Sequence, residues 1–334
     1  MEDRASLRGS VVVVTGASSG IGRATALAFA HEGAHVVVAA RRSAPLADVA
    51  AECRALAGSA LPVPTDVTDE SAVQDLALRA VNRFGRIDVW VNNAGVALWS
   101  SFENAPPDLF RRVLETNFFG VVHGARAALP HFRAEGRGVL VNVASMLGKM
   151  SLPYYTPYVA SKFAVVGFSE CLRQELRDTE ISVVTIMPAA VDTPLFQHGA
   201  NYLGHAVRPP RPVYGPDEVA ATIVRRATHP ERERFIGNSA RAFYLLHTLA
   251  PAMYEPIAAK LFKKDHVEDH PSPPTPGNLV EPMAEGTDAT GGWRTPASTA
   301  KRRVALGAVM LLPALPALLA WRLTAGRRSG RRAA

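Results

Sequence analysis

The sequence predicts an α/β fold in which a doubly wound parallel sheet is flanked by helices on both faces. Two observations lead to this prediction. Five short runs rich in valine and isoleucine recur along the chain with helical patterns between them, at 11–14, 36–40, 87–91, 139–143 and 183–187. These runs are apolar throughout, as expected for strands that are buried on both faces. Strands that alternate with helices in this way build a parallel sheet.

The first strand leads into a glycine-rich turn, and a helical pattern begins at Arg23. Glycines permit a tight turn and the close approach of a pyrophosphate, and a helix N-terminus offers unpaired N–H groups. A plain strand-to-helix turn also favours glycine, but three glycines between strand and helix favour a nucleotide site. Its candidate residues are Gly16, Ser18, Ser19, Gly20, Ile21 and Gly22.

The end of the second strand bears on the choice of dinucleotide. Sites that prefer NAD place an acid there for the ribose 2′-hydroxyl, whereas NADP sites use arginine for the 2′-phosphate. Ala40 stands at the position of the acid, and Arg41 and Arg42 follow it. Arginine is abundant in this chain and often merely solvated, but a guanidinium grips phosphate well. The pattern favours NADP(H) over NAD(H), with Arg41 as the main contact and Ser18 and Arg42 as helpers.

Tyr158 and Lys162 form the most informative pair in the second half of the chain. Lysine is rare here, with six lysines against 31 arginines, so its choice at 162 is notable. Residues four apart on a helix project from one face. A nearby cation favours phenolate, so we expect Lys162 to lower the pKa of Tyr158. Taken alone, this spacing is a common coincidence.

Together with these motifs, three further ones make the sequence resemble a short-chain dehydrogenase/reductase (SDR), with a Rossmann-like sheet, over about residues 8–240. They are Asp66-Val67 after the third strand, Asn92-Asn93-Ala94-Gly95 after the fourth, and the loop 188–193. The resemblance implies cofactor contacts at Asp66, Val67, Asn93, Ala94, Gly95, Tyr158, Lys162, Pro188, Val191 and Thr193. In the loop, Ala189 replaces the family's usual glycine, which questions the backbone geometry there.

The resemblance also implies a catalytic tetrad of Asn117, Ser145, Tyr158 and Lys162. Tyr158 would exchange a proton with a carbonyl oxygen, Lys162 would lower the tyrosine's pKa and bind the nicotinamide ribose, Ser145 would orient the carbonyl, and Asn117 would hold a proton-relaying water. The implied activity is NADP(H)-dependent interconversion of a carbonyl and an alcohol.

The segments expected to line the substrate pocket are apolar and aromatic, at 96–99, 146–150 and 152–155, with a lid around 194–213. They offer few charges to bind a phosphate or carboxylate. We therefore expect a lipophilic ketone, aldehyde or alcohol as the substrate. Ordinary core packing is the alternative explanation for these segments.

Charge and composition exclude several other function classes. Residues 301–334 hold eight cations and no acid, so subtracting them from the overall +7 leaves residues 1–300 at −1. A basic nucleic-acid-binding body is therefore a poor interpretation. Cys53, Cys171 and the histidines show no metal-ligand spacing, so we expect no metal site. The chain begins without an apolar signal segment, which suggests a reducing, cytosolic setting.

The C-terminal region differs from the body. Residues 304–321 are uncharged and mostly apolar, and as a helix they would extend about 27 Å, close to the thickness of a bilayer core. A membrane segment is therefore expected, with an apolar helix that docks on the body or on a partner chain as the alternative. We expect a catalytic domain at 1–264, a flexible Pro/Gly-rich linker at 265–303, the membrane segment, and a basic tail at 322–334.

The combined hypothesis is an enzyme anchored to the cytoplasmic face of a membrane by its C-terminal segment, and the family resemblance implies a homodimer or homotetramer. Two other function classes stay open at this point. One is a non-catalytic, membrane-tethered NADP(H)-binding sensor or scaffold. The other is an SDR-fold enzyme of another reaction class, such as an epimerase or dehydratase.

Overall fold

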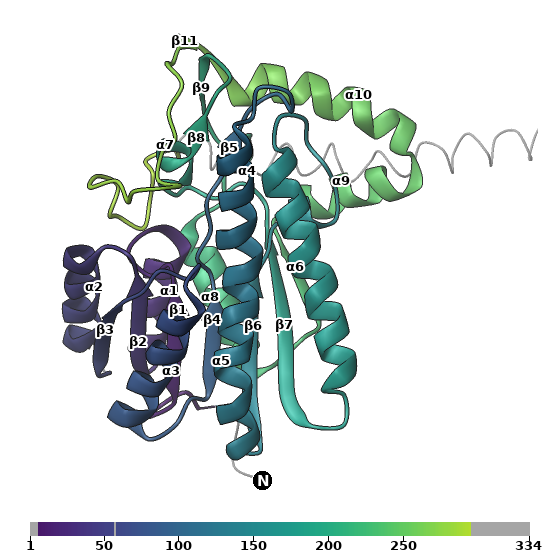
Figure 1. Cartoon of the computed structure of the whole chain (residues 1–334). Coiled ribbons are helices and arrows are strands. Elements are labelled where there is room, and N and C mark those ends of the chain that lie inside the picture. Colours follow the sequence, from purple (N-terminus) through teal and green to yellow (C-terminus); the bar gives the residue numbers. More distant parts are fainter. Residues whose placement is uncertain (1–5, 57, 295–334) are drawn as a thin grey trace, which may run out of the picture.

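A seven-stranded parallel sheet forms the centre of the protein, in a computed structural model that describes residues 6–56 and 58–294 (Figure 1). The strand order is β10-β7-β6-β4-β1-β2-β3, so the chain builds outward from β1 on one side and then from β4 on the other. The predicted doubly wound sheet is thus confirmed. The strands are β1 (Val11–Thr15), β2 (His35–Ala40), β3 (Ala60–Pro64), β4 (Val89–Asn92), β6 (Arg137–Val143), β7 (Glu180–Pro188) and β10 (Glu233–Ile236).

Helices cover both faces of this sheet. One face carries α1 (Gly20–His31), α2 (Ser43–Leu56) and α8 (Pro216–Thr228). The other carries α3 (Glu70–Phe84), α5 (Gly120–Ala134) and α6 (Thr156–Glu175). A further helix, α4 (Pro107–Leu114), continues through the π-helical turn η1 (Glu115–Phe119) into α5.

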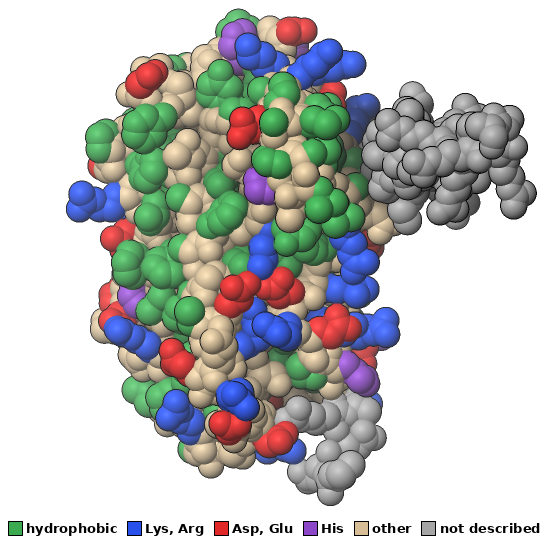
Figure 2. Space-filling view, turned by 90° about the vertical axis from the view of Figure 1, so that its right-hand side faces the viewer, with side chains coloured by type: hydrophobic (Ala, Val, Ile, Leu, Met, Phe, Trp, Pro, Cys, Tyr) green, Lys and Arg blue, Asp and Glu red, His purple; other side chains and the backbone are tan. Residues whose placement is uncertain are grey.

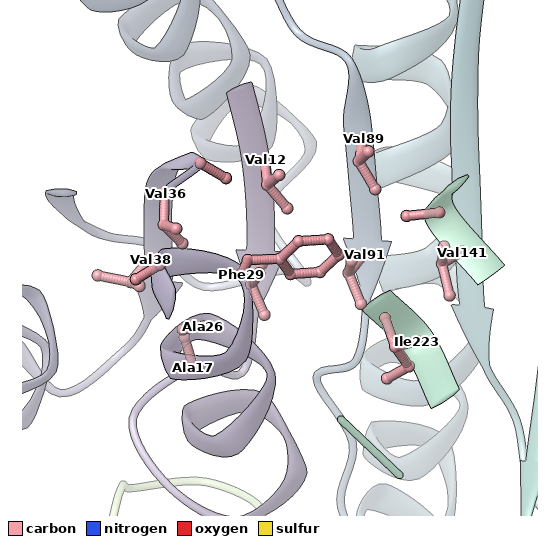
Figure 3. Close-up of a cluster of buried hydrophobic side chains, with 14 of the residues drawn as sticks. Val12, Ala17, Ala26, Phe29, Val36, Val38, Val89, Val91, Val141 and Ile223 are labelled. Atoms are coloured by element: carbon pink, nitrogen blue, oxygen red, sulfur yellow. The ribbon is translucent and has the colours of Figure 1, made fainter. Parts of the chain in front are cut away.

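Alternate side chains of each strand pack into different halves of the core. Val12 and Val14 point to the side of α1, where the Phe29 ring lies among strand valines (Figure 3). Val13, between them, packs with the α3 and α5 side. Because both faces are covered, every residue of β1 is apolar or buried, which explains the unbroken apolar run in the sequence.

Smaller elements gather beyond the carboxyl ends of the strands, at the top of Figure 1. Two helices follow β10, because the chain breaks at Ala250 and restarts with Pro251 at a helix start, where proline is tolerated. These elements are α9 (Asn238–Leu249), α10 (Pro251–Leu261), the turns η2 (Met146–Gly148) and η3 (Phe262–His266), α7 (Leu195–His198), and the short strands β5 (Leu98–Trp99), β8 (Ala200–Asn201), β9 (His205–Val207) and β11 (Val267–Pro271).

The predicted flexible linker at 265–303 differs from the structure over its described part, residues 265–294. Strand β11 pairs antiparallel with β9, and Leu279 is fully buried beside Leu98 and Val113. Buried apolar contacts and pairing with the body hold this proline-rich stretch in place. The predicted membrane segment 304–321 and basic tail lie outside the described residues. Within residues 6–56 and 58–294, no helix combines the length and apolar character needed to cross a bilayer.

Candidate active site

A cavity of about 390 Å³ opens at the carboxyl ends of β1, β4, β6 and β7. This is the edge at which ligands bind in doubly wound sheets. The structure places every predicted cofactor and catalytic residue in the wall of this cavity except Gly22 and Asn117. The wall also includes residues of α9, α10, η3 and the segment 278–283.

The glycine-rich turn is shaped by close backbone approaches. Gly16 and Gly20 have φ of +65° and +57°, which glycine adopts without strain. A Cβ on Gly16 would lie 2.7 Å from the Cα of Ala94, and one on Gly22 would lie 2.2 Å from the carbonyl oxygen of Gly16. Gly22 therefore packs α1 against the turn instead of touching a ligand, and the turn leaves a cradle of the kind that a pyrophosphate occupies.

Ser145, Tyr158 and Lys162 converge in the middle of the cavity. Ser145 caps η2 by accepting a hydrogen bond from the N–H of Leu147 at 3.1 Å, and its hydroxyl is also hydrogen-bonded to the phenol of Tyr158. Lys162 lies one turn of α6 beyond the tyrosine, with its Nζ 5.6 Å from the centre of the phenol ring. The three side chains thus surround one point at which a substrate oxygen can bind.

The predicted lowering of the tyrosine's pKa does not occur in this structure. Burial raises the pKa of Tyr158 to about 12, and the hydrogen bond with Ser145 opposes the rise. Burial also lowers the pKa of Lys162 to about 8. Desolvation dominates because the Lys162 Nζ donates to the carbonyl of Val143 at 3.0 Å and not to the phenol. At neutral pH, Tyr158 is therefore a protonated phenol with a cation nearby.

Asn117 lies in η1, fully buried behind the cavity. Its two amide N–H groups donate to the carbonyl of Val96 and to the hydroxyl of Ser161, each at 3.0 Å. Its Oδ1 accepts from the Val96 N–H at 2.8 Å. Because both side-chain donors are engaged, the side chain positions the loop after β4, and a water held by Asn117 stays a prediction from the sequence.

At the other end of the cavity, Arg41 and Arg42 lie where the sequence places a 2′-phosphate. Arg42 donates to the hydroxyl of Ser18 at 3.0 Å from Nη2. Arg112 of α4, which the sequence analysis did not single out, forms an ion pair with Asp66 at 3.1 Å. No sequence motif marks Arg112, because its ion pair depends on where α4 lies relative to Asp66, which follows β3.

The loop 188–193 accommodates Ala189 without strain. Among the described non-glycine residues, Tyr154 alone has a positive φ, of 65°, so the alanine occupies an ordinary conformation. Its N–H donates to the carbonyl of Ile236 at 2.9 Å, which joins the loop to the end of β10. The missing glycine therefore does not disturb the wall of the cavity.

The substrate side of the cavity is mostly aromatic and includes a buried polar pair, and Arg211 and Asp265 also line the cavity. The hydroxyl of Tyr155 lies 2.7 Å from Nε2 of His266, and both side chains are buried. Burial lowers the pKa of His266 to about 4, so the ring is neutral, and it also raises the pKa of Tyr155. Other wall residues here are Leu147, Leu152, Phe196, Phe243, Tyr254 and Phe262. His266 lies beyond the predicted catalytic domain, and no sequence motif marks it.

No cluster of side chains suited to a metal ion occurs within residues 6–56 and 58–294. The described cavity brings together a phenol, a hydroxyl and an ammonium group beside the glycine-rich turn. The free thiols do not contribute, since Cys53 is buried in the core and Cys171 is exposed on α6.

Comparisons with known proteins agree with this geometry. The profile of the family described as short chain dehydrogenase matches residues 10–201. The chain is 36% identical over 272 residues to the uncharacterized oxidoreductase YxnA of Bacillus subtilis, covering 80% of this chain and 76% of that protein. It is 32% identical over 281 residues to dehydrogenase/reductase SDR family member 7B of Bos taurus, covering 80% and 86%.

Two solved structures share the fold. A short chain dehydrogenase/reductase from Burkholderia phymatum in complex with NAD has a TM-score of 0.69 and 27% identity, over 76% of this chain and 97% of that one. An alcohol dehydrogenase from the archaeon Thermococcus sibiricus, complexed with 5-hydroxy-NADP, has a TM-score of 0.59 and 26% identity, over 68% and 95%. The neighbours thus include both kinds of dinucleotide.

Proposed function

The chain belongs to the short-chain dehydrogenase family and is an NAD(P)-dependent oxidoreductase, and we propose that it uses NADP(H) to interconvert a carbonyl and an alcohol on a lipophilic substrate. The observation that carries this proposal is the convergence of Ser145, Tyr158 and Lys162 in one cavity with the glycine-rich turn. The tight turn at Gly16, which lines the cavity, and the donors at Arg41 fit a phosphorylated dinucleotide.

Tyr158, Ser145 and Lys162 take different roles in the proposed reaction. The bound dinucleotide supplies or accepts the hydride. In reduction, Tyr158 gives its phenolic proton to the substrate oxygen, and its raised pKa keeps that proton in place until the transfer. Ser145 donates a hydrogen bond to the same oxygen and orients it, and the positive charge of Lys162 stabilises the phenolate that forms. In oxidation each proton moves in the opposite direction.

The preference for NADP(H) is supported by the side chains at the end of β2. Ala40 brings no carboxylate that would repel a 2′-phosphate. Among the described residues, Arg41 donates two of its five N–H groups to backbone carbonyls, which leaves three for a phosphate. Arg42, by contrast, makes five hydrogen bonds, which matches its five N–H groups. We assign the phosphate contact to Arg41 and a structural role to Arg42.

A lipophilic substrate is supported by the walls of the cavity beyond Tyr158. Phe196, Phe243 and Phe262 line that part, and the polar pair formed by Tyr155 and His266 is neutral at pH 7. Against these aromatic side chains a charged substrate would lose hydration, which is costly. An apolar carbonyl compound loses little.

Contact with a membrane is supported by the surface of α9 and α10. Leu245, Leu249, Met253 and Ile257 expose 53%, 79%, 61% and 38% of their surface. Figure 2 shows the face to which these helices contribute, and hydrophobic side chains gather in its upper half. The apolar stretch 304–321 would hold the enzyme at the cytoplasmic face of the same membrane. Sedimentation of the full chain with lipid vesicles tests this placement.

The test of the activity is NADPH consumption by the detergent-solubilised full chain with a panel of carbonyl compounds of graded hydrophobicity. We expect turnover to rise with apolar surface area. Turnover of small, charged, water-soluble carbonyls alone would contradict the lipophilic substrate, and binding of NADPH without any turnover would favour a sensor or scaffold. Sedimentation equilibrium in the same detergent tests the homodimer or homotetramer that we propose by analogy with the family.

A further inference from the structure

Residues 278–291, which we call the C-terminal cover, lie along the outer side of the dinucleotide part of the cavity. The cover begins at an apolar anchor. Leu279 has no exposed surface and packs with Leu98, Leu109 and Val113. Its carbonyl accepts a hydrogen bond from Nε of Arg112 at 3.2 Å. The start of the cover is thus joined to α4 and to the loop after β4.

Arginines that face the cavity hold the middle of the cover. Arg41 donates from Nη1 to the carbonyl of Val280 at 2.9 Å and from Nη2 to that of Asn278. Arg42 donates from Nη1 to the carbonyls of Met283 and Glu285 at 3.1 and 3.0 Å. A proline- and glycine-rich segment has few backbone partners of its own, so guanidinium donors satisfy its carbonyls.

The end of the cover is fastened to α1 and to the loop 188–193. The first N–H of α1, at Gly20, donates to the carbonyl of Asp288 at 3.0 Å, and Arg23 donates to that of Thr287 at 2.7 Å. Asp192 accepts from the N–H groups of Gly291 and Trp293 at 3.0 and 2.9 Å. The cover therefore spans from the end of the site that holds Arg41 and Arg42 to the loop 188–193.

The cover forms a wall of the cavity and does not fill it. Asn278, Pro282 and Met283 line the same 390 Å³ space as the glycine-rich turn and the ends of β2 and β3. Arg41 also keeps N–H groups free of the cover, as described above. The cover takes the Gly20 N–H of the turn and two N–H groups of Arg41, and it leaves the space between them open.

We infer that the C-terminal cover is part of the dinucleotide site: it encloses the adenosine end, and the dinucleotide enters and leaves only when the cover opens. The inference rests on the proposed function insofar as a dinucleotide must bind, but not on the preference for NADP(H). It assigns a binding role to a segment that lies outside the residues matched by the family profile.

Limited proteolysis of the unmodified full chain provides the first test. Glu285 is exposed in the cover and precedes Gly286, so a glutamate-specific protease can cut there once the cover opens. We expect saturating NADPH and NADH each to slow this cut at least fivefold, because a ligand under the cover stabilises the closed state. Faster cutting with bound dinucleotide would show that the cover competes with it and would overturn the inference.

Release kinetics provide the second test. Arg23→Ala removes a fastening at Thr287, and Leu279→Ala weakens the apolar anchor. We expect each to raise the dissociation rate of NADPH and of NADH about tenfold in stopped-flow displacement. Val280→Ala is the matched control, because this side chain is half exposed and only its carbonyl is used.

The outcomes separate the two proposals. If Arg23→Ala binds the dinucleotide normally and its dissociation rate is unchanged, the inference about the cover is overturned. The proposed function is then unaffected. Faster association without faster release means that the cover obstructs the site, and this also overturns the inference. If the unmodified chain binds neither NADPH nor NADH, the proposed function fails and the cover fails with it.

Discussion

Asn117 binds both backbone polar groups of Val96, accepting from its N–H at 2.8 Å and donating to its carbonyl at 3.0 Å. This pair ties η1 to the loop that follows β4, so the floor of the cavity is fixed from behind. Asn117 also donates to Ser161, whose hydroxyl donates to the carbonyl of Tyr158. A buried amide with both donors engaged thus connects the loop to the helix that carries Tyr158.

Asn117→Ala should lower the free energy of unfolding, because the side chain holds the loop after β4 and does not line the cavity. The substitution leaves the N–H and carbonyl of Val96 buried without partners, and each such group costs about 1–3 kcal/mol. We expect a loss of about 2–5 kcal/mol in the free energy of unfolding, measured by urea denaturation. Asn104→Ala, at an exposed position, is the control. If Asn117→Ala lost no more free energy of unfolding than Asn104→Ala, this result would contradict the positioning role.

Tyr158→Phe should abolish most turnover while dinucleotide binding remains. Removing a positioned general acid typically lowers the rate by about 10²–10⁴-fold. The ring itself stays, so the packing with Tyr155 should be kept. Single-turnover kinetics and NADPH titration separate the two effects. Tyr202→Phe, outside the cavity wall, controls for loss of any tyrosine hydroxyl. A variant that kept most of its reductase rate would remove Tyr158 from the mechanism.

Arg41→Ala should weaken NADPH binding more than NADH binding. A hydrogen bond to a charged group contributes about 1.5–3 kcal/mol, which corresponds to a loss of roughly 10- to 100-fold in NADPH affinity. Arg42→Ala is the comparison, because its donors hold Ser18 and the C-terminal cover. It should alter the affinity for both dinucleotides alike. Equal losses for NADPH and NADH in Arg41→Ala would argue against the proposed preference.

The local motifs were predictable because each is encoded within a few neighbouring residues. The turn 16–22 and the pair Tyr158 and Lys162 reach the cavity simply by lying at strand ends and on one helix face. His266 and the C-terminal cover could not be predicted in this way. Their positions depend on the pairing of β11 with β9 and on the burial of Leu279, which are contacts between distant parts of the chain.

The pKa of the tyrosine shows a second limit of local reasoning. Spacing places Lys162 near Tyr158 but does not give the hydration of either group. In the structure, burial raises the pKa of Tyr158 and lowers that of Lys162. The electrostatic effect of a neighbour is therefore set by the surroundings of the pair as much as by its separation in the sequence.

The reductase rate should fall as the pH rises through about 8. Tyr158, with a pKa of about 12, keeps its proton over this range, so it does not limit the rate. Lys162, with a pKa of about 8, loses the charge that stabilises the forming phenolate. The measurement is kcat/KM for carbonyl reduction between pH 6 and about 10, which reports groups of the free enzyme. A profile that stayed flat to pH 10 would contradict this assignment.

The same buried lysine should leave a signature in stability. The folded state lowers the pKa of Lys162 from 10.5 to about 8, so between these values the unfolded chain binds a proton that the folded chain does not. Stability from this group therefore rises with pH across that window, by roughly 3 kcal/mol for a shift of this size. Below about pH 8 both states are charged, and the folded state carries the cost of a buried ammonium, which among the described residues donates only to the Val143 carbonyl.

Lys162→Met should accordingly be inactive yet more stable than the unmodified protein below pH 8. Methionine keeps much of the side-chain volume and removes the charge, so the gain should disappear as the pH approaches 10.5, where the lysine is neutral in both states. Urea denaturation at pH 7 and pH 10 measures the difference. The tyrosines, whose raised pKa values lower stability above about pH 10, are common to both proteins and cancel in the comparison. A gain that did not shrink with pH would mean that packing, and not the buried charge, sets the stability at this position.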